Sequence, residues 1–383
     1  HNRGPEEATI WVMPTLWFRK TWYTGHEPFM PKLSKRTDTS IKVFHPKSGN
    51  YSVTFDGKPD LKFCDNETNR ERLYGIKNER KFLKDGINDY VVSGDDSHLN
   101  PEDFGTNAAA IYKITIPAGG RHQIKLRLQH QPEDQPLEIC DACLNTKITE
   151  ADEFYNGLQE RVTDPDLKRI QRQAWSGMLW SKQFYYYDVE RWLEGDPGRY
   201  VPPLARKKGR NANWKHLQNY DIISMPDKWE YPWYAAWDLA FHTIPLARLD
   251  PEFAKNQLLI LLNEWYMHPN GQIPAYEWNF SDVNPPVHAY AVQRVYQIDK
   301  KANNGVGDQE FLERALHKLM LNFTWWVNQK DSDGQNIFEG GFLGLDNISL
   351  FDRNHAQHYK GKLEQADGTS WMAMFSLNML RIS

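Results

Sequence analysis

The sequence has few cysteines, no long apolar run and no large excess of charge of either sign. Only 3 of its 383 residues are cysteine, and 46 Lys and Arg against 50 Asp and Glu leave a formal net charge of −4. Such a balance gives no electrostatic reason to expect a nucleic acid or an anionic membrane as a partner. No apolar run reaches the roughly 20 residues of a membrane-spanning helix. We therefore expect a globular protein with neither nucleic-acid nor membrane partners.

The pair Cys140 and Cys143 has the spacing of a metal or redox motif. A zinc ribbon would need a second such pair, however, and no thioredoxin-like βαβ pattern surrounds this one. We interpret the cysteines as ordinary thiols in a reducing compartment, and we expect no metal, no cofactor and a cytoplasmic location. A secretory location stays open because Asn-x-Ser/Thr sequons occur. They are at Asn50, Asn66, Asn279, Asn322 and Asn347.

Aromatic residues are abundant, with 15 Trp, 18 Tyr and 18 Phe. Core packing can absorb many of them, but tryptophans beside polar residues also suit a carbohydrate site, where ring faces and hydrogen bonds act together. The hydrophobic fraction of 40% and the charged fraction of 25% are those of a globular protein with a substantial core. At 383 residues the chain is long enough for two domains.

Apolar and polar residues alternate in the first third of the chain, which predicts β-strands. Two stretches of alternation enclose turn signals, and these predict hairpins centred on residues 117–120 and 56–57. Further strand candidates lie at residues 9–18 and 41–44. We expect residues 1–148 to form an N-terminal antiparallel β-sandwich that lacks part of its N-terminal end.

From about residue 150 the apolar spacing becomes helical. Asp164 and Asp250 each precede a proline, which predicts an N-cap followed by proline in the first turn of a helix. Residues 311–327 keep apolar side chains at spacings of three and four throughout, and a further helix is expected over 288–296. Long helices separated by loops rich in Trp, Asp, Glu and Pro suggest an α/α toroid. We assign residues 149–383 to the first part of such a domain.

The most informative stretch is residues 225–242, in which the acidic residue Asp238 follows Trp229, Trp233 and Trp237. Aromatic faces stack on the C–H faces of sugar rings, and their bulk keeps water away from a carboxyl group. A carboxyl in apolar surroundings has a raised pKa, so it can stay protonated and donate to a glycosidic oxygen. Cleavage of a glycosidic bond requires such an acid. In the alternative interpretation Asp238 only caps a helix, and the tryptophans belong to a core.

A second candidate segment, residues 270–286, carries side chains with sugar-binding chemistry ahead of a proline pair. These side chains are Gln272, Tyr276, Glu277 and Trp278. Glu277 could instead form a salt bridge within the loop. A third segment, residues 338–347, contains glycines that permit close backbone approach to a ligand.

Together these motifs resemble glycoside hydrolase family 63, which includes mannosyl-oligosaccharide (processing) glucosidase and related microbial α-glucosidases. The similarity extends over nearly the whole chain and is carried by long motifs. The matching segments are residues 2–5, 14–19, 209–211, 214, 224–233, 236–239, 271–274, 285–286, 344–347 and 363–368.

The resemblance implies a β-sandwich followed by an (α/α)6 barrel, and inverting hydrolysis of terminal α-linked glucose from oligosaccharides or small glucosides. It implies that Asp238 is the general acid, because Asp238 falls on the aspartate of the family's Trp-Asp motif. Asp346 falls on a sugar-binding aspartate, and Asn347 follows it in the same motif. The family's general base is a later glutamate that no residue here matches. We therefore expect the base and the rest of the barrel to lie beyond Ser383, and this fragment alone to be inactive.

Three other interpretations stay open. A trehalase-like or phosphorylase-like (α/α)6 enzyme would use similar helices, and phosphorolysis would need a cationic pocket, for which residues 206–210 are the obvious basic cluster. A non-catalytic carbohydrate-binding protein would keep the stacking residues. If a second carboxylate such as Glu339 or Glu364 faced Asp238, the chain would instead be catalytically complete.

Overall fold

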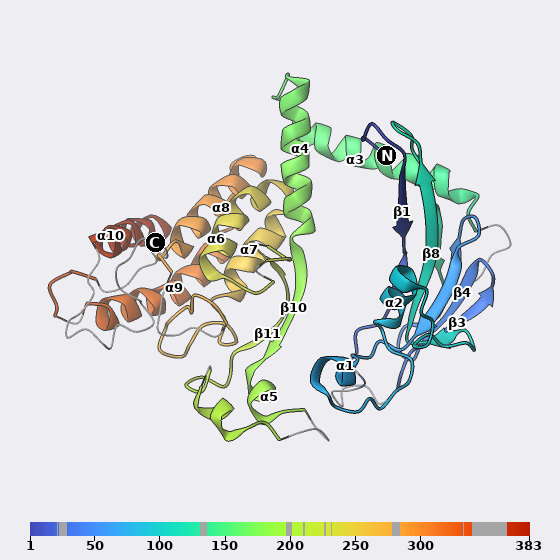
Figure 1. Cartoon of the computed structure of the whole chain (residues 1–383). Helices are drawn as coiled ribbons and strands as arrows, with labels where there is room; N and C mark the ends of the chain where they lie inside the picture. Colours follow the sequence, from blue (N-terminus) through green and yellow to red (C-terminus); the bar gives the residue numbers. More distant parts are fainter. Residues whose placement is uncertain are drawn as a thin grey trace. The chain divides into compact units, whose positions relative to one another are not determined.

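The computed structural model describes residues 1–20, 22, 29–130, 136–196, 201–209, 211–225, 227–230, 232–277, 284–331, 333–338 and 366–383. The chain divides into two compact units, His1–Glu153 and Phe154–Ser383, drawn in blue to green and in green to red in Figure 1. The predicted boundary after residue 148 falls inside a helix, α3 (Ile139–Leu158), and stays a prediction.

The described part of the N-terminal unit contains nine strands and two short helices besides the start of α3. The strands are β1 (Ala8–Val12), β2 (Thr15–Trp17), β3 (Lys32–Thr37), β4 (Ser40–His45), β5 (Gly49–Phe55), β6 (Asp60–Cys64), β7 (Phe104–Gly105), β8 (Asn107–Ile116) and β9 (Leu126–Gln129). The helices are α1 (Arg70–Tyr74) and α2 (Gly86–Ser93).

These strands form two antiparallel sheets in the described residues. In one sheet β8 pairs with β1, β2 and β6. The other sheet has the order β7-β3-β4-β5-β9. Side chains of both sheets share one core: Leu33, Val43 and Phe55 from the five-stranded sheet pack with Phe63 and Ala108 from the other. Since alternate residues of a strand point to opposite faces, this arrangement is compatible with the predicted β-sandwich.

The second face of β8 is covered by α2. Ala109 and Ile111 point away from the shared core and pack with Ile87, Tyr90 and Val91 of α2. The four-stranded sheet therefore has an inner face buried in the sandwich and an outer face that the short helix covers in part.

The two predicted hairpins are wrong, although their strands exist. The strands on either side of residues 117–120, β8 and β9, lie in different sheets, and so do β5 and β6 on either side of Gly57. Gly57 adopts a positive φ of 70°, which glycine tolerates, and the chain crosses there from one sheet to the other. Alternation correctly predicted which residues are extended, but pairing partners follow from the shared core and not from the nearest turn.

The second unit is mainly helical. Its elements among the described residues are α4 (Pro165–Trp180), β10 (Lys182–Asp188), α5 (Val189–Glu194), a 3-10 helix η1 (Leu204–Lys208), β11 (Gln218–Ser224), α6 (Ala236–Leu249), α7 (Pro251–Ile260), α8 (His288–Ala302), α9 (Gln309–Gln329) and α10 (Ala366–Ile382). Strands β10 and β11 pair as an antiparallel ribbon. None of the described helices has the length and apolar composition of a membrane span.

The predicted helix starts are confirmed. Asp164 accepts hydrogen bonds from the amides of Asp166 and Leu167 at the start of α4, and Asp250 accepts one from the Phe253 amide at 3.0 Å. In both helices proline occupies the first position, where no backbone N–H is needed. These caps fix where the helices begin and therefore which residues precede them.

Helices α6 to α10 lie side by side and share one core (Figure 1). Each contributes a fully buried residue to it: Leu246, Leu258, Val292, Leu319 and Phe375. Burying a side chain of this size contributes about 1.5–3 kcal/mol relative to leaving it exposed. The described helices are compatible with the predicted helical domain, and closure into a toroid stays a prediction.

A buried ammonium group joins three of these helices. Lys255 of α7 donates to Asp308 at 2.8 Å, and its Nζ lies 3.5 Å from Asp299 of α8. Asp308 is also the N-cap of α9 and accepts a hydrogen bond from the Phe311 amide at 3.0 Å. Burial lowers the pKa of Lys255, but the hydrogen bonds to Asp308 and Glu252 raise it by more. The ammonium therefore stays charged and holds the helix ends together.

We predict that Asp308→Ala lowers the free energy of unfolding by about 1.5–3 kcal/mol, because both the cap and an ion pair are lost. Asp308→Asn keeps a capping oxygen and should cost about 1 kcal/mol or less. Urea denaturation of the full chain, followed by far-UV circular dichroism, measures both values. Equal losses in the two variants would show that the cap contributes nothing.

Candidate functional site

The backbone joins the first two candidate segments, residues 225–242 and residues 270–286. Ala235 and Tyr276 form an antiparallel bridge, and the Ala236 amide donates to the Ala275 carbonyl at 3.2 Å. Helix α6 begins at Ala236, immediately after this bridge. The segment that contains Asp238 is therefore anchored to the segment that contains Tyr276 and Glu277.

Asp238 lies in the first turn of α6 and is half-buried. Burial raises the pKa of its carboxyl, and a hydrogen bond with its own backbone amide opposes the shift in part. The net effect is a raised pKa, as the sequence predicted. The position at a helix N-terminus has the opposite tendency, because the partial positive charge there favours a carboxylate. The site thus balances desolvation against the field of the helix.

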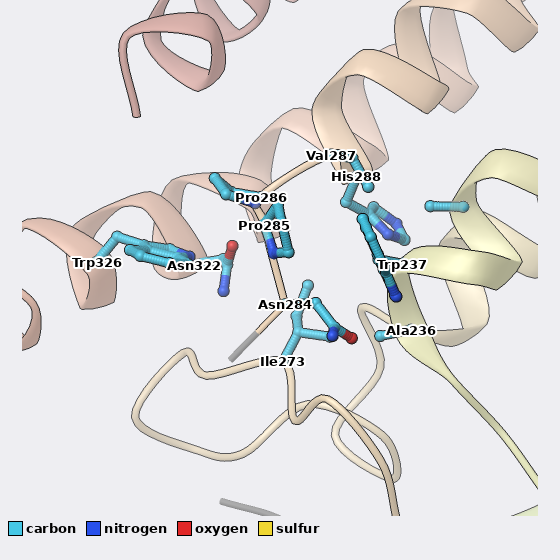
Figure 2. Close-up of a pocket in the computed structure, with 11 residues that line it drawn as sticks. Ala236, Trp237, Ile273, Asn284, Pro285, Pro286, Val287, His288, Asn322 and Trp326 are labelled. Atoms are coloured by element: carbon cyan, nitrogen blue, oxygen red, sulfur yellow. The ribbon is translucent and has the colours of Figure 1, made fainter. Parts of the chain in front are cut away.

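A small pocket of about 30 Å³ lies beside the neighbouring residue Trp237 (Figure 2). Figure 2 shows Trp237 and Ala236 of α6 on one side, and Asn322 and Trp326 of α9 on the other. Ile273, the segment 284–287 and the start of α8 also line the pocket. This volume suffices for a water molecule or two but not for a sugar ring.

The polar groups around this pocket are mostly satisfied within the chain. The Asn322 amide donates to the Gly271 carbonyl at 2.8 Å, and His288 donates from Nε2 to the Leu258 carbonyl at 2.9 Å. Burial lowers the pKa of His288 to about 4, so its imidazole is neutral at pH 7. The Oδ1 atom of buried Asn284 has no hydrogen-bond partner among the described residues. Asn284 therefore offers an acceptor at the end of the second segment.

Glu277 is deeply buried, with 2% of its surface exposed, and its Oε1 accepts a hydrogen bond from the Tyr185 hydroxyl at 2.8 Å. Burial, and then the nearby Glu277 carboxylate, raises the pKa of both Tyr185 and Tyr234. The strand β10 is thus tied to the second segment through a phenol–carboxyl contact. A sugar-binding role for Glu277 stays a prediction.

The other predicted binding residues have different positions. Trp229 is 93% exposed, so the expectation that it walls a pocket around Asp238 is corrected: its segment leaves the ring in solvent. Trp233 and Tyr276 are half-buried and Gln272 is buried, but none of the three lines the pocket beside Trp237. Trp278, Asp346 and Asn347 lie outside the described residues, as do Glu339 and Glu364.

Two residues near the site, His242 and Tyr185, were not predicted from the sequence. His242 follows Asp238 by four residues on α6, so both lie on one helix face. Its Nδ1 is 3.0 Å from the Ser224 hydroxyl at the end of β11, and burial lowers the pKa of its imidazole. The i, i+4 spacing could have indicated His242. Tyr185 is separated from Glu277 by 92 residues, and no local pattern predicts their contact.

No group of three or more His, Cys, Asp or Glu side chains in the described part of the chain is arranged to hold a metal ion. Residues 231–371 match a family model described as mannosylglycerate hydrolase MGH1-like glycoside hydrolase domain. The match supports a glycoside hydrolase. It begins just before the bridge at Ala235 and includes Asp238 together with the whole of the second segment.

An uncharacterized protein of Saccharomyces cerevisiae is 44% identical to the chain over 423 residues, and the match covers 100% of this chain and 39% of the yeast protein. The chain therefore spans well under half the length of that relative. A solved structure of an uncharacterized conserved protein from Thermus thermophilus aligns with a TM-score of 0.26 and 23% identity, over 30% of this chain and 32% of that chain.

The raised pKa of Asp238 predicts a stability change with pH. A group with a raised folded pKa contributes stability that is present below its unfolded pKa of about 3.9 and is lost as the pH rises through the folded pKa. Asp238→Asn is neutral at every pH. We therefore predict that the variant gains in unfolding free energy relative to wild type between pH 4 and pH 7, as measured by urea denaturation.

Asp250→Asn is the matched control. Burial raises the pKa of Asp250, but the hydrogen bonds from Lys182 and the Phe253 amide lower it by more, so the net shift is downward. Asparagine keeps the cap, and this variant should lose stability relative to wild type as the pH rises towards the unfolded pKa of about 3.9, with no further loss between pH 4 and pH 7. If Asp238→Asn instead followed the trend of Asp250→Asn, the helix field and not desolvation would dominate at Asp238.

Proposed function

We propose that the chain is part of a glycoside hydrolase that releases a terminal α-linked sugar with inversion at the anomeric carbon. The observation that carries the proposal is the joining of residues 225–242 to residues 270–286 at the bridge between Ala235 and Tyr276. Both segments lie in or overlap the stretch that matches a glycoside hydrolase family model. Asp238, at the start of α6 beside this bridge, is the carboxyl that we assign to the sugar site.

Two roles for Asp238 follow from the two opposing electrostatic effects. Desolvation supports a general acid, since a raised pKa keeps a proton available for the leaving oxygen. The helix N-terminus supports a carboxylate that accepts hydrogen bonds from sugar hydroxyls. In the second case another carboxyl, for which Asp346 is the candidate, would donate the proton. Desolvation outweighs the hydrogen bond to the backbone amide of Asp238, so the pKa of the carboxyl is raised, and general acid is the role that we propose.

Terminal α-linked glucose is the substrate implied by the resemblance to family 63. The name of the matched family adds mannosylglycerate, a glycoside whose aglycone carries a carboxylate, as a second candidate substrate. For either substrate Trp233, Trp237 and Trp278 are proposed to stack on the sugar, and Gln272, Glu277, Asp346 and Asn347 to bind its hydroxyls.

The basic cluster gives little support to phosphorolysis. Arg206 donates to the Trp192 carbonyl at 3.0 Å and lies over the Trp192 ring. Lys207 pairs with Glu194, whose pKa the ammonium lowers. Two of the cations that a phosphate pocket would need are thus engaged with neighbouring groups, which favours water over phosphate as the nucleophile.

We predict that the full-length protein releases glucose as its β-anomer from α-glucosyl disaccharides, or mannose as its β-anomer from mannosylglycerate. Proton NMR of the anomeric signals during the first turnovers measures this outcome, and added phosphate should yield no sugar phosphate. First release of the α-anomer would contradict inversion, formation of a sugar phosphate would indicate a phosphorylase, and absence of turnover would indicate a binding protein.

In the same experiment, substrates with poor and good leaving groups separate the two roles of Asp238. A general acid is needed for a sugar leaving group but not for fluoride. Asp238→Asn should therefore slow disaccharide hydrolysis by about 10²–10⁴-fold and slow the corresponding α-glycosyl fluoride far less. The matched variant Asp346→Asn should slow both substrates alike. The reverse pattern would make Asp346 the acid and Asp238 a binding residue.

A further inference from the structure

The described part of the N-terminal unit contains an open cleft of about 620 Å³. It lies on the outer face of the four-stranded sheet, between β2, the residues that follow β6, and α2. Its volume is within the range of about 300–1,000 Å³ that is typical of small-molecule sites. Nothing in the function proposed for Asp238 uses this cleft.

The register of β2 explains which side chains reach the cleft. Met13, Thr15 and Trp17 alternate with Pro14 and Leu16, and Leu16 packs against the core between the two sheets. Because alternate residues of a strand point to opposite faces, Met13, Thr15 and Trp17 project outward together. All three line the cleft.

Trp17 supplies an aromatic wall at the edge of this cleft. Its side chain is 57% exposed, although it belongs to a strand of the sandwich. Trp17 lies opposite Asn107 of β8 in the register, so both side chains occupy the same face of the sheet. An exposed indole beside amide groups provides both elements of sugar recognition, a stacking face and hydrogen-bonding partners.

Asn107 indicates that the cleft accommodates a polar ligand. The residue is 7% exposed, and its Nδ2 has the Cys64 sulfur at 3.5 Å as a weak partner. Its Oδ1 has no hydrogen-bond partner among the described residues. A buried amide oxygen without a partner is destabilising, because it has lost its hydrogen bonds to water. Asn107 is one of the residues that line the cleft, so its amide is a candidate partner for a ligand hydroxyl there.

The remaining polar lining consists of neutral groups and lysines. Asn66, Thr68 and Asn88 offer amides and a hydroxyl, and no Asp or Glu is among the described lining residues. Lys20 is paired with Glu67, whereas no carboxylate of the described residues pairs with the Lys84 ammonium. The lining therefore favours hydroxyl-rich ligands and disfavours cations.

We propose that this cleft is a second saccharide-binding site, in which a sugar ring stacks on Trp17 and hydrogen-bonds to Asn107, Asn88 and Lys84. The proposal stands on the N-terminal unit alone and does not depend on the chemistry at Asp238. Such a site would hold part of a longer oligosaccharide, or a second saccharide, on the β-sheet unit.

The test follows Trp17 directly by fluorine NMR of the full chain labelled with 5-fluorotryptophan. The Asp238→Asn variant is used so that no probe is hydrolysed. Maltotriose, mannotriose and cellotriose are titrated in turn, and the Trp17 signal is assigned by its absence in Trp17→Phe. We expect at least one trisaccharide to shift the Trp17 signal saturably, while the signal of Trp11 stays unchanged. Trp11 is the internal control, since it is 42% exposed on β1 of the same sheet and does not line the cleft.

A second measurement gives the affinity. Titration calorimetry uses the trisaccharide that shifts the Trp17 signal. Trp17→Ala should raise the dissociation constant of this trisaccharide about tenfold or more, and Trp11→Ala should leave it unchanged. A Trp17 signal that no trisaccharide shifts would overturn the proposal, and so would equal affinity of Trp17→Ala and wild type. Hydrolysis by the wild-type protein is scored separately, so failure here is distinguishable from failure of the function proposed for Asp238.

Discussion

The short backbone contact between Ala235 and Tyr276 is the constraint on which the candidate site depends. It fixes the start of α6, because the Ala236 amide, which has no partner within the helix, donates to the Ala275 carbonyl. When the first amide of a helix donates to the backbone of another segment, the hydrogen bond fixes the position of both segments. Asp238 in the first turn and Glu277 just beyond the bridge therefore belong to one framework, reinforced from β10 by the hydrogen bond from Tyr185 to Glu277.

The pKa shifts around this framework are caused by desolvation more than by charge pairs. The groups with raised or lowered pKa values around it, Asp238, His242, His288 and Tyr185, all owe the largest part of the shift to burial. Each shift favours the neutral form. Among the described residues, no cationic group lowers the pKa of the half-buried Asp238 carboxyl. Groups with perturbed pKa values of this kind gather at functional sites.

The sequence predicted local structure better than it predicted contacts. The Asp-Pro pairs at Asp164 and Asp250 correctly predicted where two helices begin. Capping and the preference for proline in the first turn involve only about four consecutive residues, so the local sequence contains both signals. Strand alternation was also local, but the hairpin centred on residues 56–57 was wrong because Gly57 carries the chain between sheets. At the site, the sequence predicted the raised pKa of Asp238, which burial causes. The contact of Tyr185 with Glu277 and the exposure of Trp229 depend on tertiary packing that no motif spacing contains.

The most direct test of the central claim is a crystal structure of the full-length Asp238→Asn protein with an α-glucosyl disaccharide or mannosylglycerate bound. The account predicts a sugar ring beside the bridge between Ala235 and Tyr276, with the side chain of residue 238 within about 2.6–3.2 Å of a glycosidic or hydroxyl oxygen. A sugar that binds with high occupancy elsewhere, and leaves residue 238 in contact with protein atoms alone, would contradict it.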